Sequence, residues 1–176
     1  MDIRELQREA HEVARDKGWW DKKRSFGDLI ALIHSELSEA LEAYRERGLD
    51  EWHSPDNPRK PEGVASELAD VVIRVADMAE HYGMDLAAVI ARAGVNVPSH
   101  NLSFGDHIAA CHSYLSQAWS VRPGSLGAGD WSIPIAWLIQ VVQHIAAHYG
   151  IDLNGAIEAK MEYNRSRLYR HGGKAL

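Results

Sequence analysis

The sequence contains a single cysteine, Cys111, and this scarcity excludes two kinds of site. No disulfide can form within the chain, and no zinc site built from several cysteines can exist. A lone cysteine is typical of proteins that work in a reducing compartment. We therefore expect a cytoplasmic location.

The sequence also lacks a long apolar run and an excess of positive charge. No stretch approaches the roughly 20 apolar residues that a membrane helix needs, and the charges spread over residues 1–12 are not those of a secretory signal. The formal net charge is −6 at pH 7, which argues against a nucleic-acid polymer as partner. We therefore expect neither a membrane nor a polymer partner, and any phosphate-binding surface requires a local basic patch or a metal ion.

Apolar residues recur with helical spacing along most of the 176 residues. One stripe lies within residues 3–14, a longer one within 26–44 and a third within about 62–82. Gly48 and the segment Ser54–Pro58 predict a loop between the second and third stripes, and no segment has the alternation typical of a strand. The sequence therefore predicts a single all-α domain over the whole chain.

The strongest feature of the sequence is an internal repeat. The segment Phe26–Leu41 aligns without a gap with Phe104–Trp119, and both begin with Phe-Gly-Asp. A second match pairs the segment His81–Leu86 with His148–Leu153, each beginning with His-Tyr-Gly. Similar amphipathic composition could explain scattered leucines, but it does not explain two matches in the same order. We interpret the chain as a duplication.

The repeats predict how the helices pack. The first repeat covers about residues 26–94 and the second about 104–168. A lone helical hairpin cannot bury its apolar face, so the two hairpins are expected to pack face to face as a four-helix bundle. Additional N-terminal and C-terminal helices are expected to pack outside this core.

Four acidic residues form two pairs, Glu36 with Glu39 and Glu67 with Asp70. Residues three apart share one face of a helix, and an antiparallel hairpin can bring the two pairs together. Four carboxylates at one point repel each other unless a cation lies among them. Because Mg²⁺ and Mn²⁺ prefer oxygen ligands, the pattern predicts a site for one of these metals.

Acidic pairs are also common on solvated helix surfaces. Whether these pairs bind a metal or are only solvated is therefore judged from their position relative to the apolar stripes. Glu36 and Glu67 fall on the apolar stripes of two successive helices, where a carboxylate is costly unless it is neutralised. The aligned positions of the second repeat have no acid; they are Tyr114, Gln117, Pro134 and Trp137. This joint loss is what a metal site retained in only one repeat would show.

The two acidic pairs resemble the motif of the all-α nucleotide pyrophosphohydrolases, the MazG-like and dimeric dUTPase-like superfamily. The segment from Lys160 through Asn164 to Arg167, and the basic segment up to Lys174, are similar to the C-terminal part of MazG-like proteins. Members of this family often have a further acid immediately before the first Glu-x-x-Glu, where this sequence has Ser35. The number of metal ions is therefore left open.

The resemblance implies Mg²⁺-dependent hydrolysis of a nucleoside triphosphate to the monophosphate and pyrophosphate, in nucleotide-pool house-cleaning. In this interpretation Glu36, Glu39, Glu67 and Asp70 are metal ligands, and Glu39 also positions the attacking water. Trp19 and Trp20 are candidates for stacking on the base. The remaining candidate substrate-binding residues are basic or amide side chains near the C-terminus: Lys160, Asn164, Arg167, Arg170 and Lys174.

Several alternatives remain open from the sequence. The acids also resemble those of phosphoribosyl-ATP pyrophosphohydrolases, and the bundle could instead be a non-enzymatic scaffold with a structural metal. Basic residues near a helix C-terminus can simply favour the helix dipole, and either tryptophan could close the end of the bundle. If the duplication replaced a dimer, a homodimer of this chain would correspond to a four-subunit assembly.

Overall fold

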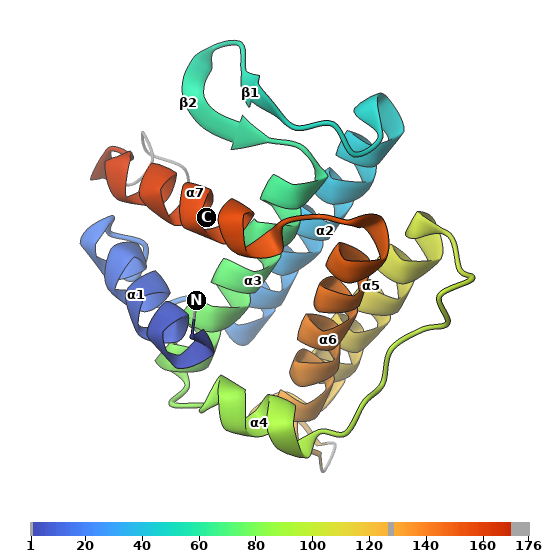
Figure 1. Cartoon of the computed structure of the whole chain (residues 1–176). Helices are drawn as coiled ribbons and strands as arrows, with labels where there is room; N and C mark the ends of the chain where they lie inside the picture. Colours follow the sequence, from blue (N-terminus) through green and yellow to red (C-terminus); the bar gives the residue numbers. More distant parts are fainter. Residues whose placement is uncertain (1, 127–128, 170–176) are drawn as a thin grey trace.

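A computed structural model describes residues 2–126 and 129–169 (Figure 1). Within them the chain forms seven α-helices and a two-stranded antiparallel sheet. The elements are α1 (Ile3–Asp16), α2 (Phe26–Arg47), β1 (Trp52–Ser54), β2 (Asn57–Glu62), α3 (Val64–His81), α4 (Leu86–Arg92), α5 (Phe104–Ser120), α6 (Ser132–Tyr149) and α7 (Leu153–Ser166). The all-α prediction with additional terminal helices is confirmed. None of the described helices combines the length and the apolar character that a membrane crossing requires.

Helices α2, α3, α5 and α6 pack around a common apolar core. α2 contacts both α3 and α5, and α6 contacts both α5 and α3. Each of the four helices contributes a fully buried side chain to this core, namely Ile33, Leu68, Leu115 and Leu138. Each hairpin therefore covers the apolar face of the other, which a single hairpin could not do alone.

The Phe-Gly-Asp motifs begin α2 and α5 in the same way. Ser25 and Asp28 form a capping box, in which the backbone N–H of each residue donates to the side chain of the other. Ser103 and Asp106 form the same reciprocal pair at the start of α5. Because these side chains satisfy N–H groups that have no partner within the helix, both first turns are fixed by the same local chemistry.

The helix that follows each hairpin packs against the other hairpin. α4 follows α3 in the chain but contacts α6, whereas α7 follows α6 but contacts α3 (Figure 1). α1 also packs along α3. The helix that carries Glu67 and Asp70 is therefore covered by α1 and by α7, and α7 brings the C-terminal basic residues beside it.

Residues 52–62 form a β-hairpin, so the prediction of a loop without strands was wrong here. Trp52 lies opposite Glu62, and its indole N–H donates to the Glu62 carboxylate at 2.8 Å. Pro58 and Pro61 interrupt the alternation that would have indicated a strand. Both strands of a two-stranded sheet are edge strands, and an edge strand tolerates proline where its N–H would face solvent.

Candidate metal centre and adjoining cleft

Three of the four predicted metal ligands converge between α2 and α3. Glu36 comes from α2, and Glu67 and Asp70 lie three residues apart on α3. One carboxylate oxygen from each lies within 4.8 Å of the other two. Glu36 and Glu67 are each 6% exposed, and Asp70 is partly exposed. This carboxylate triad is an all-oxygen donor set of the kind that Mg²⁺ binds together with water and phosphate oxygens.

Glu39, the predicted fourth ligand and water-positioning residue, lies outside the carboxylate triad. It is exposed, and its carboxylate accepts a hydrogen bond from the Ser35 hydroxyl at 3.0 Å, one turn earlier on α2. Burial is the main cause of the raised pKa of Glu36 and Glu67, but the Glu39 charge adds to both shifts. Glu39 is therefore close enough to act on the triad electrostatically without being one of its converging oxygens.

Two basic side chains neutralise the carboxylate triad. The Lys160 ammonium, on α7, lies 2.6 Å from Asp70 Oδ2 and 3.9 Å from Glu67 Oε1. Its side chain is 3% exposed. Arg74, on α3, donates from Nε to Glu36 Oε1 at 2.7 Å and has a second guanidinium nitrogen 2.6 Å from the same oxygen. Buried carboxylates need such partners, and α7 supplies one of them from the second hairpin.

Burial also changes the pKa of the two glutamates of the carboxylate triad. It raises the pKa of Glu67 to about 8, opposed by Lys160 and reinforced by the neighbouring acids. Burial likewise raises the pKa of Glu36, with Arg74 acting in the opposite direction. Near neutral pH the metal-free folded chain therefore favours the protonated form of Glu67. A divalent cation would replace that proton, so metal binding and proton release are coupled.

This shift predicts how stability depends on pH. Because the folded state holds the Glu67 proton more tightly than the unfolded state, Glu67 destabilises the metal-free protein increasingly as pH rises from about 4.5 towards 8. The neutral Glu67→Gln variant should therefore gain stability relative to wild type by up to about 1.4 kcal/mol per pH unit in this range. Urea unfolding in EDTA between pH 5.5 and 8 measures the difference.

The matched control for this pH series is Glu12→Gln, which removes one acidic group from an exposed position on α1. Added Mg²⁺ should reduce the pH dependence of wild type because a bound cation stabilises the ionised carboxylates. A stability difference between Glu67→Gln and wild type that stays constant over this range would contradict the burial-driven pKa shift.

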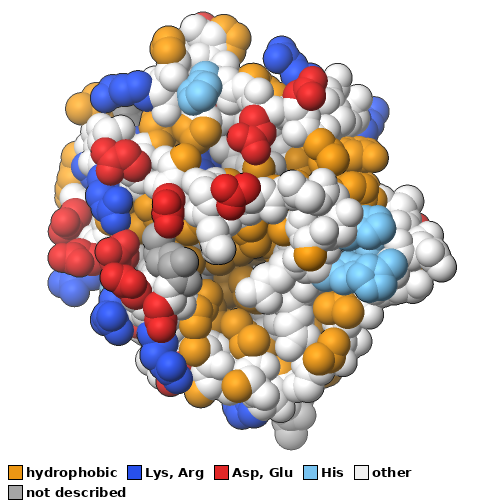
Figure 2. Space-filling view, in the orientation of Figure 1, with side chains coloured by type: hydrophobic (Ala, Val, Ile, Leu, Met, Phe, Trp, Pro, Cys, Tyr) orange, Lys and Arg blue, Asp and Glu red, His pale blue; other side chains and the backbone are white. Residues whose placement is uncertain are grey.

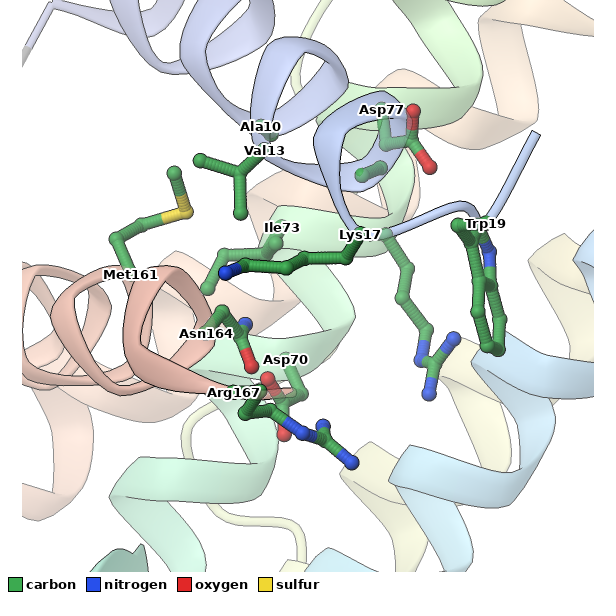
Figure 3. A pocket seen from close by; sticks show the side chains of 12 residues that line it. Ala10, Val13, Lys17, Trp19, Asp70, Ile73, Asp77, Met161, Asn164 and Arg167 are labelled. Atoms are coloured by element: carbon green, nitrogen blue, oxygen red, sulfur yellow. The ribbon is translucent and has the colours of Figure 1, made fainter. Parts of the chain in front are cut away.

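A small cleft of about 90 Å³, partly open to solvent, adjoins the carboxylate triad between α1, α3 and α7. In Figure 3, Asn164 and Arg167 extend from α7 on the side of Asp70, Lys17 reaches across the cleft and Trp19 stands at its far wall. Burial lowers the pKa of Arg167, whose side chain is the third cation of the lining beside Lys17 and Arg74. The cleft is thus lined by the carboxylates of Asp70 and Asp77, by three cations and by the Trp19 ring.

Trp19 and Trp20 have different environments although they are adjacent in the chain. The Trp20 indole N–H donates to Asp77 Oδ1 at 2.9 Å, and the ring stacks on His81 with 3.9 Å between centroids. Trp19 lines the cleft, and the Arg24 guanidinium lies 3.8 Å above its ring. Trp20 therefore anchors the loop to α3, whereas Trp19 is the one of the two that lines the cleft.

The last described residue, Tyr169, reaches the tryptophan loop. Its hydroxyl donates to the Asp21 carboxylate. Gly18 has φ +74°, and a Cβ added there would lie 2.6 Å from the Tyr169 ring. Both the backbone conformation and this close approach require glycine. Arg170 and Lys174, which were predicted to bind substrate, lie outside the described residues.

Two basic residues that line the cleft, Arg74 and Lys17, were not predicted from the sequence. Arg74 follows Glu67 by seven positions and Asp70 by four, so its helical phase on the acidic face could have identified it. Lys17 lies just after the end of α1, where no periodicity predicts which way a side chain points. Its position in the cleft depends on the packing of α1 along α3.

The structure brings most of the predicted site residues together and separates two of them. Glu36, Glu67, Asp70 and Lys160 make one charged cluster, and Asn164, Arg167 and Trp19 line the cleft beside it. Glu39 and Trp20 lie outside these two groups. Comparison of the chain with family models, with curated proteins and with solved structures finds no match.

Proposed function

We propose that the protein hydrolyses a nucleoside triphosphate to the monophosphate and pyrophosphate in a Mg²⁺-dependent reaction, with Mn²⁺ as an alternative metal, as part of nucleotide-pool house-cleaning. The observation that carries the proposal is the meeting of the carboxylate triad with Lys160 of α7 beside a cleft that is lined by Trp19. The resemblance of both sequence segments to MazG-like proteins supports the same activity.

Different residues along the cleft have different proposed roles. The carboxylate triad would hold the metal ion, which when bound supplies positive charge for the phosphate oxygens and for the attacking water. Arg167 and Lys17 line the part of the cleft where phosphate groups would lie, and guanidinium groups bind phosphate through paired hydrogen bonds. Trp19 is the proposed stacking residue for the base, which would compete with the Arg24 guanidinium for the ring. Glu39 is the proposed water-positioning residue because it lies exposed beside the triad.

Lys160 connects the metal site with the phosphate site. A divalent cation bound by the carboxylate triad competes with its ammonium for Asp70, which now lies 2.6 Å away. Asn164 is four residues further along α7, on the same face of the helix, and lines the cleft. An ammonium displaced from Asp70 would therefore remain beside the space proposed for the triphosphate.

The direct test is pyrophosphate release from a panel of ribonucleoside, deoxyribonucleoside and modified triphosphates that also contains phosphoribosyl-ATP. At least one triphosphate should release pyrophosphate with Mg²⁺ or Mn²⁺, and EDTA should stop the reaction. Preferential turnover of phosphoribosyl-ATP would assign the related alternative activity. Absence of release from every compound, in a folded sample with either metal, would overturn the proposal.

A structural role for the acids is the competing interpretation, and one observation favours it. Lys160 and Arg74 already neutralise the carboxylate triad without a metal ion. In that case the cluster is an internal ion-pair network of a helical scaffold, and Mg²⁺ should change neither Tm nor any reaction rate. A Mg²⁺-dependent rise in Tm that is lost in Asp70→Asn would favour the metal site.

The two tryptophans provide a second test. Trp19→Ala should raise KM for the triphosphate by about 10-fold to 100-fold, because a stacked base typically contributes about 1–3 kcal/mol, and it should change Tm little. Trp20→Ala should instead lower the free energy of unfolding by about 3 kcal/mol, because it removes packing against His81 and a donor to Asp77. Steady-state kinetics and urea unfolding of both variants measure the contrast, and the opposite pattern would exchange the two assignments.

A further inference from the structure

Four histidines gather around the second hairpin, outside the carboxylate triad. His100 lies in the connection between α4 and α5, His107 on the first turn of α5, and His144 and His148 four residues apart on α6. Figure 2 shows histidine side chains grouped at the right of this face, over the end of α6 and the start of α5. No step of the proposed reaction uses them.

Five of the six pairs among these rings have centroid distances close to those between ligands of one ion. The His144 ring centroid lies 4.3 Å from that of His100, 5.3 Å from that of His107 and 6.2 Å from that of His148. The His148 centroid lies 5.9 Å from that of His100 and 6.0 Å from that of His107. Imidazoles bound tetrahedrally at about 2.0–2.1 Å from a zinc ion have centroids about 5 Å apart. The backbone therefore already holds the rings near the required separation.

The centre of the cluster contains polar atoms without partners. His107 is fully buried, and within the described residues neither of its ring nitrogens has a hydrogen-bond partner. His144 Nε2 is also buried without a partner among these residues. Burial and the neighbouring histidines lower the pKa of His144, which favours the neutral form that binds metals. Buried polar groups in folded proteins are normally satisfied, so these nitrogens point to a missing ligand.

The first hairpin provides an internal comparison. With the offset of 67 between the repeats, His144 corresponds to residue 144 − 67 = 77, which is Asp77, and His148 to residue 148 − 67 = 81, which is His81. Asp77 is satisfied there by His11 at 2.7 Å and by Trp20 at 2.9 Å. The corresponding place in the second hairpin contains imidazoles beside the Tyr149 ring, and His144 Nε2 has no hydrogen-bond partner there among the described residues.

We propose that His100, His107, His144 and His148 bind one transition-metal ion, with Zn²⁺ the best match. Imidazole nitrogens suit Zn²⁺, Cu²⁺ and Ni²⁺, whereas Mg²⁺ requires oxygen ligands. The bound ion would join the α4–α5 connection to α5 and α6.

Binding requires the histidine rings to turn. Among the described residues the carboxylate triad is the group whose ligand atoms already converge, so the imidazole nitrogens must rotate towards the common centre about χ1 and χ2. Within the part of the chain that the structure describes, no hydrogen bond holds the His107 ring against this rotation. His100 and His148 are exposed, which gives an ion a path into the cluster from solvent.

Calorimetric titration of the full-length chain, without a polyhistidine tag, with ZnCl₂ tests the proposal. Excess Mg²⁺ is present so that Zn²⁺ does not report on the carboxylate triad. One equivalent should bind, and the double variant His144→Ala/His148→Ala should raise Kd by at least about 100-fold. Co²⁺ in place of Zn²⁺ should give the visible absorption of a tetrahedral site. His112→Ala, which removes a histidine of another pair, should leave Kd unchanged.

A second variant tests whether weaker Zn²⁺ binding results from the loss of a ligand or from loss of folding. His107 corresponds to residue 107 − 78 = 29 in the first repeat, which is a buried leucine, so His107→Leu should keep the packing while it removes one ligand. Weakened Zn²⁺ binding with unchanged Tm supports the site. Zn²⁺ binding by wild type that is no tighter than that of the double variant overturns it, and so does binding that disappears in Glu67→Gln, because that result places the ion in the carboxylate triad.

Discussion

Replacement of Glu67 by glutamine is expected to abolish Mg²⁺-dependent pyrophosphate release, with kcat/KM falling by more than about 100-fold. Groups that merely orient a metal ligand typically contribute 10-fold to 100-fold, so loss of an anionic ligand should exceed that range. Glutamine keeps the shape of a side chain that is 6% exposed. The fold should therefore persist while the triad loses one of its three converging carboxylates. Steady-state kinetics with titrated Mg²⁺, together with circular dichroism, separate the two effects.

Glu42→Gln is the matched control for this substitution. Glu42 lies on α2, in the same hairpin as Glu67. It is exposed, and it pairs with Arg45 of the same helix at 2.6 Å. Its loss should change turnover less than twofold. The rise in Tm that Mg²⁺ causes in wild type should be retained in Glu42→Gln and lost in Glu67→Gln. Normal turnover by a folded Glu67→Gln protein would remove the metal assignment from the triad.

Replacement of Lys160 by methionine is expected to destabilise the metal-free protein by about 3–5 kcal/mol, because removal of one partner leaves a buried charge uncompensated. Lys160 is 3% exposed and lies 2.6 Å from Asp70. Methionine fills much of the same volume without a charge, so the loss reports on electrostatics more than on packing. Urea unfolding in EDTA measures the effect. Mg²⁺ should restore a large part of the lost stability because the ion can take the place of the ammonium.

Lys60→Met provides the comparison for Lys160→Met. Lys60 pairs with Glu62 at 2.9 Å, but its side chain is 39% exposed. Pairs of this kind typically contribute about 0–1 kcal/mol, so this variant should remain close to wild type. A Lys160→Met protein as stable as wild type would show that Lys160 does not neutralise the acids. A destabilised variant that Mg²⁺ cannot rescue would favour the scaffold interpretation.

The buried part of the candidate site could be predicted because helical periodicity reports burial. Glu36 and Glu67 fall on apolar stripes, and both carboxylates are buried in the structure. Glu39 lies at the edge of its stripe, where a side chain can turn to solvent, and its carboxylate bonds Ser35 instead of joining the triad. Spacing of three residues identifies a shared helix face, but it does not fix which side chains at the edge of that face point inward.

The features that depend on contacts between distant segments could not be predicted. The position of Lys160 against Asp70 requires α7 to cross α3, and no local pattern specifies that crossing. The separate environments of Trp19 and Trp20 arise from α3, which supplies Asp77 to one of them. The β-hairpin was missed because its prolines remove the period-two signal while edge strands tolerate them.

The crossing of α7 over α3 also determines how the site assembles. If the carboxylate triad and Lys160 belonged to two separate molecules, the fraction of complete sites would depend on the concentration of those molecules. Here one polypeptide carries both, so the two parts meet within a single molecule at a fixed and high local concentration. The assembled site therefore survives dilution, and activity per molecule should stay constant as the protein is diluted. The first repeat can therefore lack the basic residues that α7 supplies, and the second repeat can lack the carboxylates that α2 and α3 supply.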